Sequence, residues 1–225
     1  MRAPGDILSY EEMCREEGKR LQKGMNYPRG RRPGVFLMSR RKNALYTDRI
    51  EEDGKILIYE GHDIRETPGL DAKSVDQPLL NPDGSLTDNG KFFDAAGRAR
   101  AGFEPLTVHV YEKLQTSIWI FKGEFHLLDA WVEDAGQRKV CKFRLRLLES
   151  AKREAVGELD NPRLIPGDVM AAVWKRDGGA CRACGTTTNL HFDHIIPYSK
   201  GGTSLKAENV QVLCARHNLS KGARL

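Results

Sequence analysis

Two short cysteine motifs near the C-terminus restrict the fold of this chain more than any other feature of its sequence. The first is a C-x-x-C pair at residues 181–184, and the second is a C-x-x-H pair at residues 214–217. Two such pairs on separate turns can place four ligands at the corners of a tetrahedron, which is the geometry of structural Zn²⁺. The pattern therefore predicts one structural zinc ion bound by Cys181, Cys184, Cys214 and His217.

A C-x-x-C pair can also be a redox motif at the N-terminus of a helix. Here it is followed by G-T-T-T-N at residues 185–189, which is typical of a turn, and this favours zinc over redox chemistry. The chain has five cysteines, an odd number, and three of them lie in the last 45 residues. This distribution argues against a disulfide framework and for a reducing compartment, so we expect a cytoplasmic protein.

The composition is that of a folded protein with room for two domains. Charged residues make up 30% of the 225 residues and hydrophobic residues 40%, a balance typical of globular chains. No apolar run approaches the roughly 18 residues that cross a bilayer. The opening residues M-R-A-P-G-D are not followed by an apolar core, so we expect neither a secretory signal nor a membrane partner.

The positive charge is concentrated at the C-terminal end. Residues 166–225 hold +4 of the net charge of +5, while the basic and acidic residues of the remainder nearly cancel. A small basic unit suggests a polyanionic partner, most simply nucleic acid. Charge alone leaves a solvated surface without a partner as an equal alternative. About 60 residues bury little apolar surface, so a unit of this size needs an additional crosslink, such as a bound metal ion, to stabilise its fold.

The element pattern predicts an α+β chain with a mostly β N-terminal part. The capping-box pattern S-Y-E-E starts a predicted helix over 11–23 that ends at Gly24, and a second helix is predicted over 91–100. Turn residues separate about seven strands, and residues 62–89 form a loop excursion. We therefore expect a barrel or strongly bent sheet. The predicted strands are 35–39, 44–50, 55–59, 106–112, 117–122, 124–131 and 139–147.

A linker and a second, smaller domain follow the predicted sheet. Residues 158–167 (ELDNPRLIPG) contain two prolines and little periodicity, and a helix is predicted over 166–176. We expect an N-terminal domain at 1–150, a linker at 151–165 and a C-terminal domain at 166–225.

The segment between the two metal motifs carries a further set of motifs. In order along the chain these are D-H-I-I-P from residue 193, K-G-G from residue 200, Asn209, and C-x-x-H-N-x-x-K-G from residue 214. Over about residues 165–222 the chain resembles the HNH nuclease family, whose fold is the ββα-metal motif. The resemblance implies a metal-dependent endonuclease acting on DNA.

The same resemblance assigns roles to individual residues. It implies that His194 is the general base, that Asp193 is a ligand of a catalytic Mg²⁺ or Mn²⁺, and that Asn209 braces the loop carrying His194. The family often has His as the third letter of its motif, but Asn218 stands there, so Asn218 is the implied second metal ligand. His217 could take that role instead of the zinc role, although its spacing from Cys214 favours zinc.

The chemistry of these residues agrees with phosphodiester hydrolysis. An imidazole can deprotonate water, and a carboxylate with an amide oxygen can hold a hard divalent cation. Lys221, with other nearby basic residues, is a candidate phosphate contact, and the alternative for each is an exposed surface charge. His191 lies two residues before Asp193, and we assign it no catalytic role.

The N-terminal part carries a second, looser set of motifs: G-V at residue 34, Y-x-D at residue 46 and Y-E-G at residue 59. With K-F-R-L in the run 140–147, these elements resemble the SRA domain, the PUA-like barrel that flips modified cytosine out of duplex DNA. The resemblance spans about residues 24–148. It departs from the family after Y-E-G, where His62-Asp63 replaces a glycine-rich stretch.

A flipped cytosine needs an aromatic face for stacking and an acceptor for its exocyclic amine. Tyr46 and Tyr59 are the stacking candidates, and Asp48 is the candidate acceptor. Without the resemblance, half-buried strand tyrosines and a turn aspartate are the simpler interpretation. Arg40 and Lys42 belong to a basic run that suits phosphate contacts, with surface charge as the alternative.

These observations predict a modification-dependent endonuclease that reads 5-methylcytosine, or a related modified cytosine, in double-stranded DNA. One alternative is a homing-type or repair HNH nuclease whose β domain recognises sequence or lesions. Another is a modified-DNA reader whose nuclease unit is inactive. One nuclease site per chain cuts one strand, so a duplex break implies either a homodimer or two independent nicks.

Overall fold

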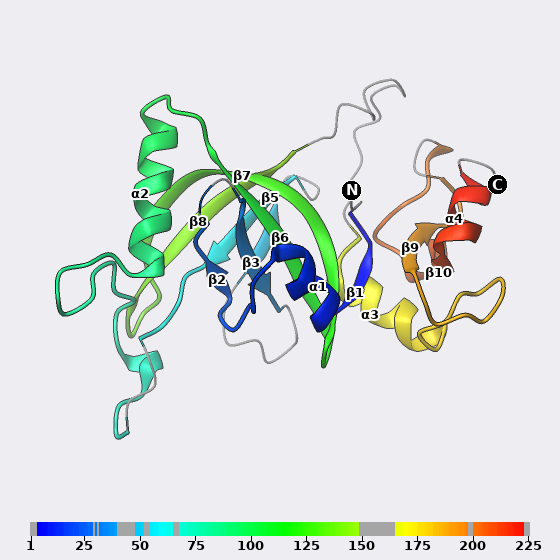
Figure 1. The fold of residues 1–225 in the computed structure, drawn as a ribbon, viewed down its shortest axis with the longest axis horizontal. Helices are drawn as coiled ribbons and strands as arrows, with labels where there is room; N and C mark the ends of the chain where they lie inside the picture. Colours follow the sequence, from blue (N-terminus) through cyan, green and yellow to red (C-terminus); the bar gives the residue numbers. More distant parts are fainter. Residues whose placement is uncertain are drawn as a thin grey trace.

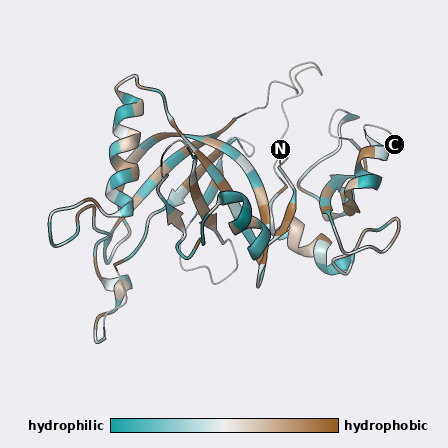
Figure 2. Cartoon of the chain, viewed as in Figure 1, coloured by the Kyte–Doolittle hydropathy of each residue, from teal (hydrophilic) through white to brown (hydrophobic). Residues whose placement is uncertain are grey.

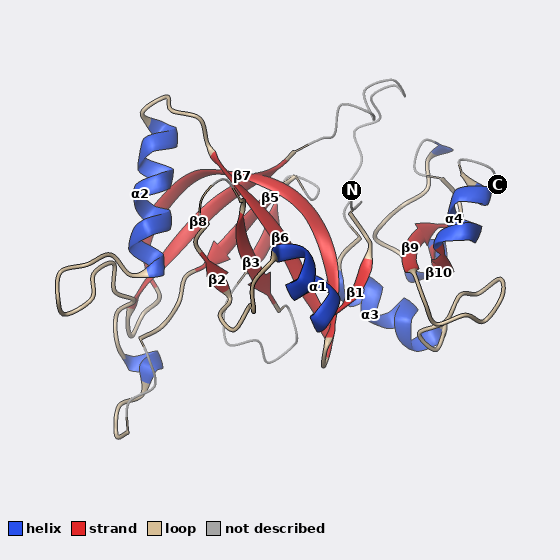
Figure 3. Ribbon diagram, in the orientation of Figure 1, coloured by secondary structure: helices blue, strands red, loops and turns tan. Residues whose placement is uncertain are grey.

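The computed structural model describes residues 4–28, 30, 32–39, 48–51, 55–64, 68–148, 165–197 and 200–222. The predicted α+β class is confirmed (Figure 3). The N-terminal unit contains β1 (Ile7–Ser9), α1 (Tyr10–Glu17), β2 (Met25–Asn26), β3 (Gly34–Met38), β4 (Arg49–Glu51), β5 (Ile56–Glu60), α2 (Asp88–Arg100), β6 (Leu106–Gln115), β7 (Ile118–Asp134) and β8 (Lys139–Leu147). The C-terminal unit contains α3 (Gly167–Arg176), β9 (Leu190–His194), β10 (Val210–Cys214) and α4 (Ala215–Lys221).

The N-terminal unit is built on a single bent sheet. Its strands follow the order β2-β3-β6-β7-β8-β5-β4, and β1 pairs with β7 beside this path. β3 and β6 are parallel, whereas the other neighbouring strands are antiparallel. Figure 1 shows β7 arching across the unit, so the predicted strong bend is present.

Strand β7 differs from the prediction of two strands separated at Gly123. The structure has one strand of 17 residues. Gly123 has φ +125°, and the β6–β7 register shifts next to it, between Val110 and Tyr111. A glycine at positive φ lets the chain pass through a bulge and continue in the same strand. The local pattern therefore indicated a turn where the sheet instead bends.

Helix α1 begins where predicted and ends earlier. The Glu12 N–H donates to Ser9 Oγ at 3.2 Å, and the Ser9 N–H donates to Glu12 Oε2 at 2.8 Å, which completes the capping box. The helix ends at Gly18, which adopts the left-handed conformation at φ +64°, rather than at Gly24. Both glycines follow a polar run, and the sequence did not distinguish between them.

Helix α2 covers one face of the sheet and closes the main hydrophobic core. Phe92 of this helix is fully buried, and its ring meets Phe36 of β3 edge-on at 4.7 Å between centroids. Phe143 of β8 packs against Phe92 in the T-shaped geometry that aromatic pairs prefer. Figure 2 shows hydrophobic segments along the strands of the sheet beside this helix.

The C-terminal unit is small and packs its own apolar cluster. Strands β9 and β10 form an antiparallel hairpin, and α4 follows β10 directly. Buried residues of α3, β9 and β10 form a cluster that also includes Ile120 of β7. Among the described residues, none of the helices combines the length and the apolar character needed to cross a membrane.

Two glycines of α2 allow a matched test of this packing. An added Cβ at Gly90 would lie 2.1 Å from the Leu79 carbonyl oxygen, whereas one at Gly97 would meet open space. We expect Gly90→Ala to lower the free energy of unfolding by more than about 1 kcal/mol. Gly97→Ala should raise it by roughly 0.5–1 kcal/mol, because alanine favours the helix. Urea unfolding of both variants measures the difference, and equal effects would contradict this packing.

Candidate metal centre and catalytic site

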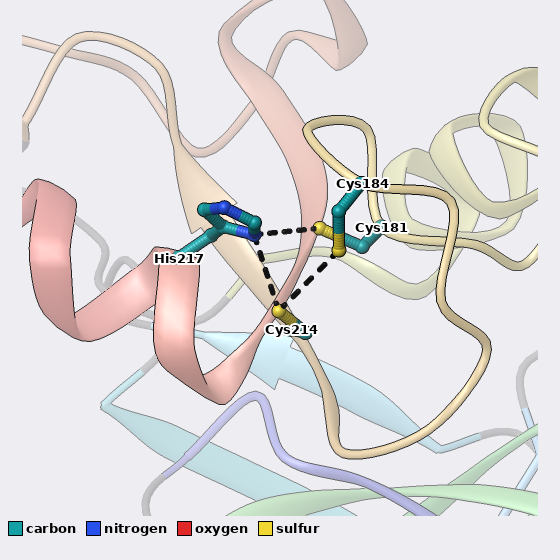
Figure 4. A group of neighbouring side chains, drawn as sticks. All are labelled: Cys181, Cys184, Cys214 and His217. Atoms are coloured by element: carbon teal, nitrogen blue, oxygen red, sulfur yellow. Dashed lines mark hydrogen bonds between the residues drawn. The ribbon is translucent and has the colours of Figure 1, made fainter.

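The four predicted zinc ligands lie together (Figure 4). The ligand atoms of Cys181, Cys184, Cys214 and His217 are all within 4.8 Å of one another. His217 Nδ1 lies 3.5 Å from Cys181 Sγ and 3.3 Å from Cys214 Sγ, and the Sγ atoms of Cys184 and Cys214 are 3.9 Å apart. The two motifs come from a turn after α3 and from the junction between β10 and α4.

These distances fit a tetrahedral zinc site. With Zn–S near 2.3 Å and Zn–N near 2.0–2.1 Å, the edges of such a tetrahedron are about 3.8 Å between sulfurs and about 3.5 Å between sulfur and nitrogen. Burial raises the pKa of Cys181, but backbone N–H groups of Cys214, Ala183 and Cys184 and the His217 ring outweigh it and lower the pKa to about 6. A thiolate is the form that binds metal.

His194 ends strand β9, at the mouth of the hairpin loop. Its Nε2 lies 2.9 Å from the hydroxyl of Ser204, which is fully buried. Burial lowers the pKa of His194, and of its charged neighbours Asp193 opposes this while Lys221 adds to it. A lowered pKa keeps the imidazole neutral near pH 7, the form that can accept a proton.

Asp193 precedes His194, and its carboxylate is held from two sides. Gln211, its partner across the hairpin, donates from Nε2 to Asp193 Oδ2 at 3.1 Å. The ammonium group of Lys221 lies 3.1 Å from the same oxygen and donates to the His194 carbonyl at 2.6 Å. A cationic group therefore already lies against the carboxylate for which a divalent cation was predicted.

Asn218 lies on α4, three residues before Lys221. Residues three apart share a face of a helix, and Lys221 reaches Asp193, so Asn218 is on the face that looks toward β9. A carboxylate and an amide oxygen are hard donors of the kind that Mg²⁺ accepts. Asp193 and Asn218 thus fit a divalent cation by their chemistry, and His217, the residue before Asn218, is engaged in the thiol cluster.

Asn209 ties down the loop that follows His194. Its Oδ1 accepts from the Ile196 N–H at 2.8 Å, and its Nδ2 donates to the carbonyls of Ile196 and Thr203 at 3.2 and 3.0 Å. Gly202 is required at this point, since an added Cβ would lie 1.9 Å from the Ile196 oxygen. These contacts give a physical reason for the Gly of K-G-G and for Asn209.

The N-terminal unit places two of its candidate residues side by side. Asp48 Oδ1 accepts from the Glu60 N–H at 2.9 Å, next to Tyr59 on β5. Burial raises the pKa of Asp48 to about 7; the Glu60 N–H and Lys142 oppose this shift, and the Glu60 charge adds to it. Asp48 is therefore largely protonated below neutral pH.

Tyr59 is a core residue in the structure. It is 3% exposed, its ring packs at 4.4 Å on Phe36, and its hydroxyl donates to the Leu37 carbonyl at 3.1 Å. These contacts favour a packing role over a stacking surface. Tyr46, Arg40 and Lys42 lie outside the described residues.

A buried charge cluster lies beside Asp48, and the sequence did not predict it. Lys142 is 1% exposed and its ammonium lies 2.9 Å from Glu60 Oε2, while Arg138 lies 3.3 Å from Glu60 Oε1 and also pairs with Asp63. Buried charges are found where they are paired and hydrogen-bonded, as here. The sequence shows only alternation, since Lys142 occupies the same alternating positions of β8 as Arg144 and Arg146, which are less buried.

Ser204 and Gln211 were also missed as site residues. Gln211 could have been found from the hairpin register, because it pairs with Asp193 across the two strands. For Ser204 the sequence carries no signal, since its contact with His194 depends on how the loop folds back.

Comparisons with known proteins give one family match and a set of similar solved structures. Residues 181–225 match a family model described as HNH endonuclease. No protein with a curated description matches the chain.

Three solved structures represent the structural matches of this chain. SUVH5 SRA with fully methylated CG DNA is 19% identical, with a TM-score of 0.46, and the match covers 71% of this chain and 93% of that one. SUVH5 SRA with methylated CHH DNA is 20% identical, with a TM-score of 0.45 over 71% and 92%. SUVH6 of Arabidopsis thaliana in complex with SAM is 18% identical, with a TM-score of 0.44 over 75% and 28%.

The thiol cluster yields a prediction about stability. Replacing Cys184, the exposed ligand, with serine removes one of four metal ligands without disturbing the buried core. We expect Cys184→Ser to lose the bound zinc and to unfold the C-terminal unit while the bent sheet stays folded, because the unit is too small to fold without its staple. Metal analysis and a two-step thermal melt measure this. Absence of zinc from pure wild-type protein would contradict it.

Proposed function

We propose that this chain is a modification-dependent DNA endonuclease. Its C-terminal domain, residues 166–225, hydrolyses phosphodiester bonds, and its N-terminal domain, residues 1–150, selects duplex DNA carrying 5-methylcytosine or a related cytosine. Residues 151–165 link the two. The observation that carries the proposal is the hairpin that holds Asp193 and His194 beside the Cys₃His cluster, within the segment that matches the HNH endonuclease model.

His194 is the general base in this proposal. The 2.9 Å contact between its Nε2 and Ser204 Oγ orients the ring. In the tautomer that carries the proton on Nε2, Nδ1 is the atom that takes the proton from water. The lowered pKa of His194 keeps this lone pair available at neutral pH. Asn209 holds the loop after His194 through its backbone contacts and so preserves the ring orientation.

Asp193 and Asn218 are the proposed ligands of the catalytic cation. When bound, Mg²⁺ or Mn²⁺ supplies a Lewis acid for the charge that develops on phosphorus and the leaving oxygen. Gln211 orients the Asp193 carboxylate from the neighbouring strand. Lys221 adds a second positive charge at this position and is placed to meet a phosphate oxygen next to the carboxylate.

Asp48 is the proposed reader of the flipped base. The Watson–Crick edge of neutral cytosine presents an amine donor at N4 and an acceptor at N3. An ionised carboxylate can only accept, whereas a protonated carboxyl both donates and accepts. The pKa of about 7 therefore gives Asp48 the form that matches both atoms of the edge below neutral pH. Tyr46 is the proposed stacking residue, and Tyr59 supports the site from the core.

Arg40 and Lys42 are the proposed phosphate contacts of the reader domain. We place the protein in the cytoplasm, where its thiol cluster stays reduced. A duplex break would come from a homodimer or from two successive nicks.

The nuclease proposal is tested with His194→Ala on a duplex that carries 5-methylcytosine. We expect cleavage in Mg²⁺ or Mn²⁺ to fall by at least roughly a hundredfold, because the base acts in the chemical step. The affinity for the duplex should stay within about twofold of wild type, since DNA binding rests on phosphate contacts elsewhere. Ser204→Ala is the matched variant and should keep part of the activity. A His194→Ala enzyme that cuts at the wild-type rate would contradict the assignment.

The reader proposal is tested with two replacements of Asp48. Asn keeps both a donor and an acceptor without ionising, so Asp48→Asn should retain the preference for the modified duplex from pH 6 to pH 8. Wild type should lose preference as the pH rises through about 7, the pKa of Asp48. Asp48→Ala should lose the preference throughout, by about tenfold or more. Equilibrium binding to modified and unmodified duplexes measures this, and unchanged preference in Asp48→Ala would contradict the assignment.

The Asp48→Asn variant also tests how the free energy of unfolding depends on pH. The folded pKa of Asp48 lies above its unfolded value of 3.8, so between about pH 4 and pH 7 the folded protein binds the extra proton. Stability is then lost as the pH rises through this window. Asp48→Asn should remove that loss and be the more stable protein above pH 7, with little difference at pH 4. Urea unfolding at both pH values measures it, and parallel pH profiles would contradict the raised pKa.

A further inference from the structure

The N-terminal segment is hydrogen-bonded on both of its edges. On one edge, Gly5 N–H donates to the Phe121 carbonyl at 2.8 Å, and the Phe121 N–H donates to the Asp6 carbonyl at 2.9 Å. On the other edge, the Phe192 N–H donates to the Gly5 carbonyl at 3.4 Å, and Asp6 pairs with His191 in an antiparallel bridge. The segment therefore joins β7 of the N-terminal unit to β9 of the C-terminal unit (Figure 1).

A side-chain pair reinforces this bridge. His191 Nδ1 lies 2.7 Å from Asp6 Oδ1, and both side chains are largely covered, at 23% and 13% exposure. His191 is the residue to which the sequence assigned no catalytic role. It lies on the strand that carries Asp193 and His194, so a contact at His191 acts directly on the position of that strand.

A second contact holds the start of α3 against the sheet. Lys122 of β7 lies 2.9 Å from Glu112 Oε2 of β6, and its ammonium also donates to the Ile165 carbonyl at 2.9 Å. Both charged side chains are 3% exposed. Pro166, the N-cap residue of α3, makes no side-chain capping bond, and the Glu112 carboxylate lies at this positive end of the helix.

The fit at this contact is close. An added Cβ at Gly167 would lie 1.8 Å from Glu112 Oε1, so only glycine leaves room for the carboxylate. Ile120 of β7 is buried in the same apolar cluster as Val169 of α3 and Phe192 of β9. Backbone pairing, buried charge and apolar packing therefore meet along one interface between the two units.

The covalent connection cannot provide this constraint by itself. Sixteen residues separate Leu148 from Ile165, and a connection of that length sets only an upper limit of about 50 Å on the distance between its ends. The contacts between the two units can hold a base-reading site and a cutting site at one fixed distance.

We infer that residues 5–9 are a positioning strand for the nuclease reaction. The strand fixes β9, and with it Asp193 and His194, against β7, so that cuts fall at a set distance from the modified base. Asp6 and His191 act through the position of β9 and not on the substrate. This inference rests on the proposed function.

The first test locks the interface covalently. Paired residues of an antiparallel bridge have Cα atoms about 4.5–5.5 Å apart, within the range that a disulfide spans. We expect Asp6→Cys combined with His191→Cys to form a disulfide with oxidised glutathione. The locked full-length enzyme should cut a duplex with one modified cytosine at the wild-type positions, with a rate within about twofold of its reduced form.

The single variants Asp6→Cys and His191→Cys, treated in the same way, are the controls for oxidation of the zinc thiols. Failure of the disulfide to form would overturn the inference. So would a locked enzyme that cuts at other positions, or stops cutting while both oxidised single variants remain active.

The second test loosens the interface. Gly167→Ala forces the Glu112 carboxylate away and should spread the cut positions over additional nucleotides, with the affinity for the duplex unchanged. Gly97→Ala on α2, where an added Cβ meets nothing, is the matched control and should keep the wild-type positions. Shortening the carboxylate with Glu112→Asp should narrow the distribution again in the Gly167→Ala background. Cut positions in Gly167→Ala as narrow as in wild type would overturn the inference.

The two proposals fail in different ways. If wild-type protein does not distinguish modified from unmodified duplex, the proposed function is wrong, whatever the variants do. Disulfide formation is measured by mass spectrometry without DNA, so it decides whether the units are docked even in that case.

Discussion

The Cys₃His cluster is the constraint on which the C-terminal unit of the chain depends. Cys214 ends β10 and His217 lies in the first turn of α4, so binding one ion at this junction sets the angle between strand and helix. That angle places Lys221 of α4 against Asp193. The opposite motif, Cys181 and Cys184, anchors the turn after α3. A ligand set with no catalytic role therefore determines the geometry of the site.

The N-terminal unit depends on a different kind of constraint, a buried network of charge. Lys142 and Arg138 hold Glu60 at the end of β5, and the backbone of Glu60 holds Asp48. Two cations and the carboxylates that they pair occupy positions that apolar residues would fill in an ordinary sheet. The free energy of desolvating these groups is offset only when all of them are in place. The network thus fixes where Asp48 lies, while burial raises the pKa of Asp48 and the Lys142 charge opposes that shift.

The sequence predicted features that depend on spacing, and missed those that depend on distant contacts. The clustering of Cys181, Cys184, Cys214 and His217 was predicted because two motifs with a fixed spacing carry the information locally. The start of α1 was found for the same reason, at Ser9. Its end was assigned to Gly24 instead of Gly18, and β7 was divided at Gly123, because a glycine in isolation does not reveal whether the chain stops, turns or bulges.

The residues of the candidate sites also divide into those predicted from motifs and those brought together by distant contacts. The positions of Asp193, His194 and Asn209 followed from motifs, but Ser204 meets His194 only after the loop folds back. The partners of Asp48 come from β5 and β8, and the interface contact of Asp6 comes from 185 residues away in sequence. No local pattern predicts such pairs, because helix and strand periodicity relates only residues that are close in the sequence. The sequence of β8 does not distinguish the buried Lys142 from Arg144 and Arg146, which follow it at alternating positions and are less buried.

The most direct measurement of the central claim is a competition between two duplexes of one sequence in a single reaction. One duplex carries 5-methylcytosine, the other carries cytosine, and each has its own fluorescent label. With wild-type protein and Mg²⁺ or Mn²⁺, we predict that the methylated duplex is cut about tenfold faster or more, because the reader must recover the cost of flipping the base. Cleavage of both duplexes at equal rates would contradict the account.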